Sequence, residues 1–215
     1  MNIYQKLMLP ILRTRGQRQL LTGSRKKALA IFEKLCRWSD KPENRFNLAL
    51  VKMNLRDYQG ALEILANIYK LLPDQVFAGL TYGQCLLLAK EWDEAEKVYS
   101  ELLALHPENN LLKMMSELAK DPVARDKFTA SLDLQFQANL LEEGKKYREA
   151  LELLNKAAGL TPEDAALHNN LGALKLKLKY PMQDVLSEFS KAMQLNPEKD
   201  IYKRNYRKAW QKSHH

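Results

Sequence analysis

The stretch EWDEAEKVYSELLALHPENN, residues 91 to 110, repeats the pattern of an earlier stretch, RDYQGALEILANIYKLLPDQV, residues 56 to 76. At an offset of 34 residues, aromatic, small, apolar and proline positions coincide: Tyr58 with Trp92, Ala61 with Ala95, Leu65 with Tyr99, and Pro73 with Pro107. Self-similarity at a fixed period of this length is typical of arrays of repeated supersecondary units. The sequence therefore predicts a repeat architecture.

The same pattern extends over most of the chain. Full units run over 42–75 and 76–109, and a third covers 131–164. A fourth, 165–199, fits once one extra residue is allowed near Tyr180 and Pro181. A degenerate unit covers 9–41 and keeps three of the repeat residues, which are Gly16, Ala28 and Phe32.

Each unit is predicted to be two helices of about a dozen residues, because apolar residues recur at spacings of three and four. A small residue of the first helix, such as Gly83 or Gly172, is expected to face the alanine of the second helix and allow close approach of the two backbones. The closing proline cannot continue a helix, so it is expected to end the second one.

Spacing and residue types resemble the tetratricopeptide repeat family, although no tryptophan holds the early first-helix position. The resemblance implies an all-α fold, a right-handed α-solenoid of helix-turn-helix repeats with a C-terminal capping helix. The expected organisation is a basic segment and degenerate repeat over 1–41, two full repeats over 42–109, an irregular helical connector over 110–130, two repeats over 131–199, and a capping helix and tail over 200–215. Within the connector, one helix is expected to end near Lys120 and a second to begin at Asp121 and Pro122, running on into the unit at 131.

Composition favours a folded, non-enzymatic protein. The 215 residues are 46% hydrophobic and 28% charged, without an apolar run long enough to span a membrane or a cleavable secretory leader, so a cytoplasmic location is expected. No catalytic, metal or cofactor motif is present, and neither the four histidines nor Cys36 and Cys85, expected to be buried and reduced, have metal-ligand spacing. His214 and His215 have the character of a tag remnant.

The expected function is that of a non-enzymatic protein-interaction adaptor or chaperone-like scaffold, which binds a peptide or helical segment in a concave groove lined by the first helices. In the family that this chain resembles, positions 2, 5, 9 and 12 of each unit face the groove. In the first two full units these positions are largely apolar, and they hold Glu43, Phe46, Leu50, Met53, Phe77, Leu80, Gln84 and Leu87. The expected partner is an amphipathic helix or an extended apolar segment of another protein or of a second copy of this chain. The alternative is that a neighbouring helix or residues 1–8 bury some of these side chains.

Some members of the family clamp the carboxylate at the end of a peptide. Asn139 and Asn170 match the asparagine positions of that clamp, whereas Gln135 replaces its first lysine, and Lys203 and Arg207 lie about two residues out of register. The resemblance therefore implies a polar half-groove that hydrogen-bonds an extended main chain rather than a full clamp.

The charges favour a second hypothesis, an adaptor on an anionic surface. Residues 1–32 carry seven basic side chains and no acidic one, and residues 199–215 carry six basic side chains against Asp200. The stretch IYQKLMLPILRTR mixes apolar and basic residues, as an interfacial helix or an organelle import leader would. Nucleic acid and an anionic membrane are the alternative partners, and a basic end of the repeat stack without a ligand is the third interpretation.

Overall fold

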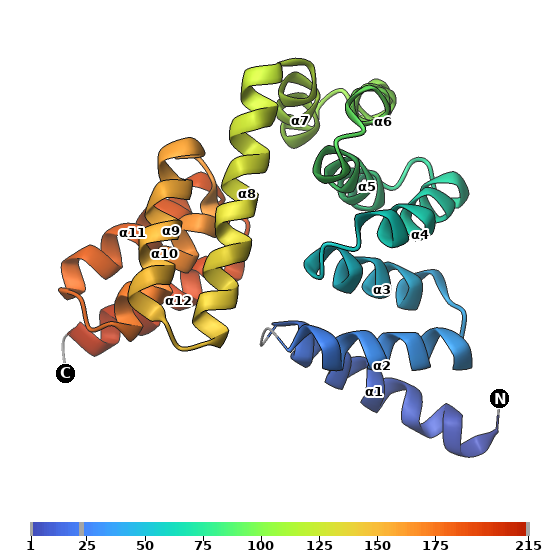
Figure 1. Cartoon of the computed structure of the whole chain (residues 1–215), viewed down its shortest axis with the longest axis horizontal. Coiled ribbons are helices and arrows are strands. Elements are labelled where there is room, and N and C mark those ends of the chain that lie inside the picture. Colours follow the sequence, from blue (N-terminus) through green and yellow to red (C-terminus); the bar gives the residue numbers. More distant parts are fainter. Residues whose placement is uncertain (1, 22–23, 214–215) are drawn as a thin grey trace. The chain divides into compact units, whose positions relative to one another are not determined.

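The computed structural model describes residues 2–21 and 24–213, and it is helical, without a strand in these ranges (Figure 1). His214 and His215 lie outside the described residues. The helices are α1 (Ile3–Leu21), α2 (Arg25–Trp38), α3 (Pro42–Asn54), α4 (Tyr58–Leu71), α5 (Val76–Ala89), α6 (Trp92–Leu105), α7 (Asn110–Lys120), α8 (Pro122–Glu143), α9 (Tyr147–Leu160), α10 (Ala165–Lys177), α11 (Met182–Leu195) and α12 (Asp200–Ser213).

The chain divides into two compact units, Met1–Arg125 and Asp126–His215. In the first unit each helix from α1 to α7 packs against the next one along the chain. In the second unit α9, α10, α11 and α12 pack in succession, and Ala138 of α8 joins the buried cluster around Leu154 of α9. The predicted all-α fold of helix pairs is thus confirmed, with α3–α4 and α5–α6 forming the first two full repeats.

The turn inside each of the four better repeats has the same backbone. Its fifteenth residue is in the left-handed region, with φ between 60° and 65°, at Arg56, Lys90, Lys145 and Lys179. That conformation ends the first helix and reverses the chain direction. The extra residue of the last repeat falls after Lys179, since α11 begins one position later than its counterparts. The residues at this left-handed position are basic, so no glycine marks the position in the sequence.

The small residue of each first helix faces a side chain of the second helix. A Cβ built on Gly83 would lie 2.6 Å from Cε1 of the Tyr99 ring, and one on Gly172 would lie 2.8 Å from Cδ1 of Phe189. The prediction that these glycines face an alanine is therefore wrong. An aromatic ring is larger than the methyl group of alanine, so the ring can pack this close to the first helix only because glycine has no Cβ.

The five repeats share this size relationship. Gly16 meets Phe32 in the degenerate repeat, as Gly83 and Gly172 meet their rings. In the other two repeats, alanine holds the small position and leucine the opposing one, and the two share a buried cluster: Ala49 with Leu65, and Ala138 with Leu154. Glycine pairs with an aromatic ring and alanine with leucine, so the summed volume is similar in every repeat, as a close-packed interior requires.

The other repeat residues behave as predicted. Ala95 and Tyr99 are fully buried, and α4 and α6 end two residues before Pro73 and Pro107. In the connector, α7 ends at Lys120, and α8 runs without a break from Pro122 to Glu143. Asp121 caps α8, because its Oδ1 accepts a hydrogen bond of 2.9 Å from the backbone N–H of Val123.

A charged cluster lies between α10 and α11 in the second unit. Nδ1 of His168 lies 2.7 Å from Oε2 of Glu188, and Nζ of Lys175 donates a 2.6 Å hydrogen bond to Oε1 of the same carboxylate. The other ring nitrogen of His168 lies 2.9 Å from the Pro162 carbonyl oxygen. Burial raises the pKa of Glu188, but the hydrogen bonds from Lys175 and His168 outweigh it, so the net shift is downward.

Candidate functional site

The exposed surface of α3 and α5 centres on a contact between two aromatic rings. Phe46 of α3 and Phe77 of α5 have ring centroids 5.2 Å apart with an interplanar angle of 44°. Phe46 is half-buried, but 69% of Phe77 is exposed. Position 5 of one repeat thus meets position 2 of the next, and the pair keeps apolar surface open to solvent.

The contact between position 5 of one repeat and position 2 of the next recurs one repeat earlier, where both side chains are charged. Arg13 holds position 5 of the degenerate repeat, and its Nη1 lies 3.2 Å from Oε2 of Glu43, which holds position 2 of the next repeat. The contacts therefore place α1, α3 and α5 side by side at their groove positions. An ion pair joins α1 to α3, and an aromatic pair joins α3 to α5.

The remaining groove positions of these helices differ in exposure. Leu50 and Met53 of α3 and Leu80 and Gln84 of α5 are half-buried, so part of each side chain remains accessible. Leu87 is fully buried, and its expected place in the groove is wrong. It lies one helical turn after Gly83, on the side of α5 that packs against α6, whereas half-buried Leu88 continues the line of Phe77, Leu80 and Gln84.

Sequence reasoning missed three apolar residues of α7. Leu111 and Met114 are 47% and 51% exposed, and Leu118 is half-buried. They lie 34 residues after Phe77, Leu80 and Gln84, so the repeat spacing itself predicts them. They were overlooked because no full repeat could be fitted to 110–130. We define the apolar strip as the side chains at these groove positions: Phe46, Leu50, Met53, Phe77, Leu80, Leu111, Met114 and Leu118.

The polar positions of the second unit do not assemble into a clamp. Nε2 of Gln135 donates a 3.1 Å hydrogen bond to Oδ2 of Asp164, the residue that caps α10, so Gln135 ties α8 to α10. Asn139 is exposed and Asn170 is half-buried.

On α12 another residue takes the place expected for the clamp cations. Asn205 reaches α10, where its Nδ2 donates to Oδ1 of Asn169 at 2.8 Å. Lys203 and Arg207 each lie two residues from Asn205, which is about 200° around a helix, so they point away from the side that meets Asn169.

Other kinds of site find little support in the described ranges. Between residues 2 and 213, leaving aside 22 and 23, no three His, Cys, Asp or Glu side chains are grouped so that they could hold a metal ion. Over the same part of the chain, no helix is both long and apolar enough to cross a membrane. Cys85 is buried as expected, but Cys36 is only half-buried.

Comparison with known proteins places the fold. Residues 53–118 match a tetratricopeptide repeat family model, and this match includes α7 as far as Leu118. No curated protein matches the chain. A tetratricopeptide repeat protein from Parabacteroides merdae is 16% identical, with 95% of this chain and 85% of that chain covered and a TM-score of 0.50.

Two further solved structures are similar. A thermophilic TPR protein of Thermus thermophilus is 16% identical, covering 94% of this chain and 98% of that one, with a TM-score of 0.49. MamA from Desulfovibrio magneticus is 22% identical, covering 89% and 97%, with a TM-score of 0.44. Residues 53–118 thus match the tetratricopeptide repeat family, and the helix pairs that recur every 34 residues show the same repeat fold outside that stretch.

Proposed function

We propose that this protein is a non-enzymatic interaction scaffold whose apolar strip binds an amphipathic helix or an extended apolar segment of a partner protein. One observation carries the proposal: Phe77 is 69% exposed while its ring contacts Phe46 of the neighbouring repeat. An apolar pair that the fold itself leaves open, at positions that recur in the next repeat, has the character of an interaction site.

The strip offers enough surface for a short ligand. Burying a large apolar side chain contributes on the order of 1.5 to 3 kcal/mol. Phe77, Leu111 and Met114 are each about half exposed or more. Together with the accessible parts of Phe46 and Leu80, they can offset the ordering of a short segment, which costs about 0.5 to 1.5 kcal/mol for each immobilised side chain.

Site-specific cross-linking tests the proposal. A photo-reactive amino acid at position 77 is expected to capture an apolar segment of a partner in a cell lysate, and mass spectrometry then identifies the linked peptide. Met114→Asp should greatly reduce this capture, because it places a charge within the strip. The matched control carries the photo-reactive group at Leu71, which is 64% exposed at the end of α4 and lies off the strip.

Three outcomes separate the alternatives. Equal yields of the same peptides from positions 77 and 71 would refute the strip as a binding site. Linked peptides from this chain itself would identify the partner as a second copy. Loss of helical circular dichroism in Met114→Asp would mean that this residue supports the fold, and Leu111→Asp, at another exposed residue of the strip, then becomes the test variant.

A further inference from the structure

The first helix has an apolar side that the fold does not use. Ile3, Leu7 and Ile11 recur every four residues, so they lie along one side of α1, and they are 77%, 68% and 57% exposed. The opposite side of α1 packs on α2, with Leu12 buried and Gly16 against the ring of Phe32. Helix α1 therefore carries a second apolar side, which its packing against α2 does not require.

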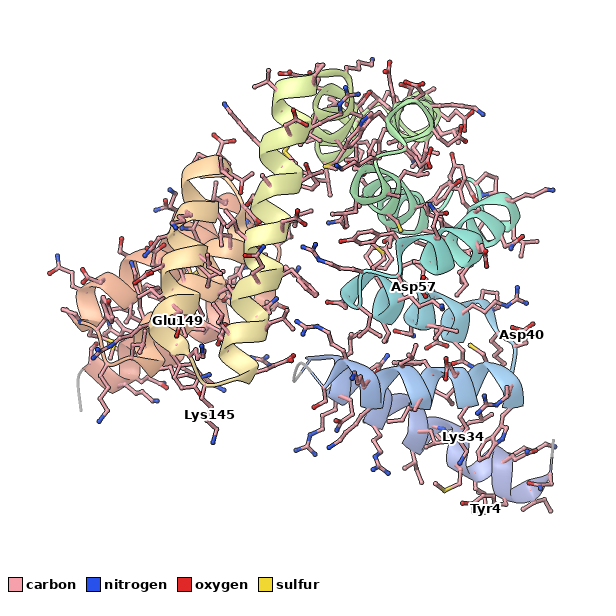
Figure 2. All side chains as sticks on the ribbon, viewed as in Figure 1. Tyr4, Lys34, Asp40, Asp57, Lys145 and Glu149 are labelled. Carbon is pink, nitrogen blue, oxygen red and sulfur yellow. The ribbon has the colours of Figure 1, made fainter. Side chains whose placement is uncertain are left out.

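Two aromatic side chains with polar tips border this exposed side. Tyr4 of α1 is 61% exposed, and its ring meets that of Trp38 of α2 edge-on, with centroids 6.3 Å apart. Nζ of Lys34 lies 4.5 Å from the centroid of the Trp38 ring, and Tyr4 and Lys34 lie at the same end of the α1–α2 pair (Figure 2). Rings that combine an apolar body with a polar tip are enriched where a membrane meets water.

Basic side chains surround the patch. Lys6 and Arg15 on α1 and Lys26 and Lys27 on α2 are exposed, and residues 1–32 contain no acid. Lys27 lies seven residues before Lys34 and thus on the same side of α2. The apolar side of α1 is therefore flanked by positive charge over its whole length.

The nearest acids do not cancel this charge. Glu33 of α2 is exposed on the same helix as five basic residues. Asp40, after α2, pairs with Arg45, and Glu43 of α3 pairs with Arg13. The local surface thus remains positive.

We propose that α1 lies in the surface of an anionic lipid bilayer, with Ile3, Leu7 and Ile11 in the acyl boundary and Tyr4 and Trp38 at the level of the headgroups. Lysine and arginine side chains from α1 and α2 contact the acidic headgroups. Nucleic acid would match the basic residues but not the exposed apolar ones. A bilayer surface matches both, as for amphipathic helices that lie in the interface.

Vesicle sedimentation tests the proposal. The full chain should sediment with vesicles of phosphatidylcholine and phosphatidylserine but not with phosphatidylcholine alone, and binding should weaken from low to physiological salt. Leu7→Ser with Ile11→Ser should lower the partition coefficient about tenfold or more, because two large apolar groups leave the acyl boundary. The matched control is Leu71→Ser with Leu105→Ser, two exposed leucines of α4 and α6, which should bind as the unaltered chain does.

Charge and depth are tested separately. Lys6→Gln with Arg15→Gln and Lys27→Gln should lower binding to anionic vesicles and flatten its salt dependence. In a chain with Trp92→Phe and Trp210→Phe, fluorescence of the remaining Trp38 should shift to the blue when vesicles are added.

Four results would overturn the proposal. The first is equal binding to neutral and anionic vesicles, and the second is unchanged binding of the Leu7→Ser, Ile11→Ser variant. The third is binding of a DNA duplex with no binding of vesicles, which would assign the basic surface to nucleic acid. The fourth is self-association that the same double variant abolishes, again without vesicle binding, which would make this side of α1 a contact between two copies.

Discussion

Substitution of Gly83 by alanine tests whether the packing of a glycine against an aromatic ring holds the α5–α6 helix pair together. The added Cβ would lie 2.6 Å from Cε1 of Tyr99, a ring that is fully buried. A normal carbon–carbon contact needs a retreat of roughly 1 Å, for which a close-packed interior has no room. Overpacking costs about 1 to 3 kcal/mol, and the higher helix propensity of alanine returns up to about 1 kcal/mol. We expect Gly83→Ala to lower the free energy of unfolding by about 1 to 2 kcal/mol, measured by urea denaturation followed by helical circular dichroism.

A double-mutant cycle isolates the contact. Tyr99→Leu alone should cost about 2 to 4 kcal/mol through the cavity that it leaves. Combined with Gly83→Ala, it recreates the alanine–leucine pair of the other repeats, so the double variant should be more stable than the sum of the single changes by about 1 to 2 kcal/mol. Gly159→Ala is the matched control, since nothing lies within 4 Å of its Cβ, and it should stabilise α9 by up to about 1 kcal/mol. Additivity within about 0.3 kcal/mol in the cycle would refute this account of repeat packing.

Three further changes probe other parts of the fold. Because the folded-state pKa of Glu188 lies below its ordinary 4.5, its stabilisation is present above that value and is lost as the pH falls through the folded pKa. Glu188→Gln should therefore cost about 1 to 3 kcal/mol at neutral pH and lose less further stability than the unaltered chain on acidification, measured as urea midpoints against pH. Burial raises the pKa of Cys85 to about 12, so a thiol reagent should label half-buried Cys36 in the folded protein and Cys85 only on unfolding; rapid labelling of both would contradict the burial. Ala95→Leu should cost about 1 to 3 kcal/mol because Ala95 is fully buried, whereas the surface change Glu91→Gln should do little, and equal shifts in thermal midpoint would show the helix faces to be misassigned.

Much of the fold could be predicted from the sequence because the determinants are local and repeated. Helical periodicity, the alanine at position 20 of every repeat but the last and the closing prolines act within one helix pair, and the same pattern recurs every 34 residues. The groove positions follow from the same periodicity, and the structure brings Phe46 and Phe77 together as neighbours at two of them. The exposed apolar residues of α7 follow the same 34-residue spacing, but they were not predicted because 110–130 does not fit a complete repeat.

Other features were decided only by tertiary packing. Periodicity tells which residues share a side of a helix, but it does not tell how many neighbours cover that helix. Leu87 is apolar and holds a groove position of its repeat, yet it is buried because α5 packs against both α4 and α6. On α12, the residue that meets Asn169 is Asn205, because the rotation of a helix about its axis is set by what it packs against. The sequence alone therefore determined the repeat, its helices and their apolar sides. Tertiary structure decided which apolar sides are covered and which, on α1, α3, α5 and α7, remain open, since burial depends on neighbours that are distant in sequence.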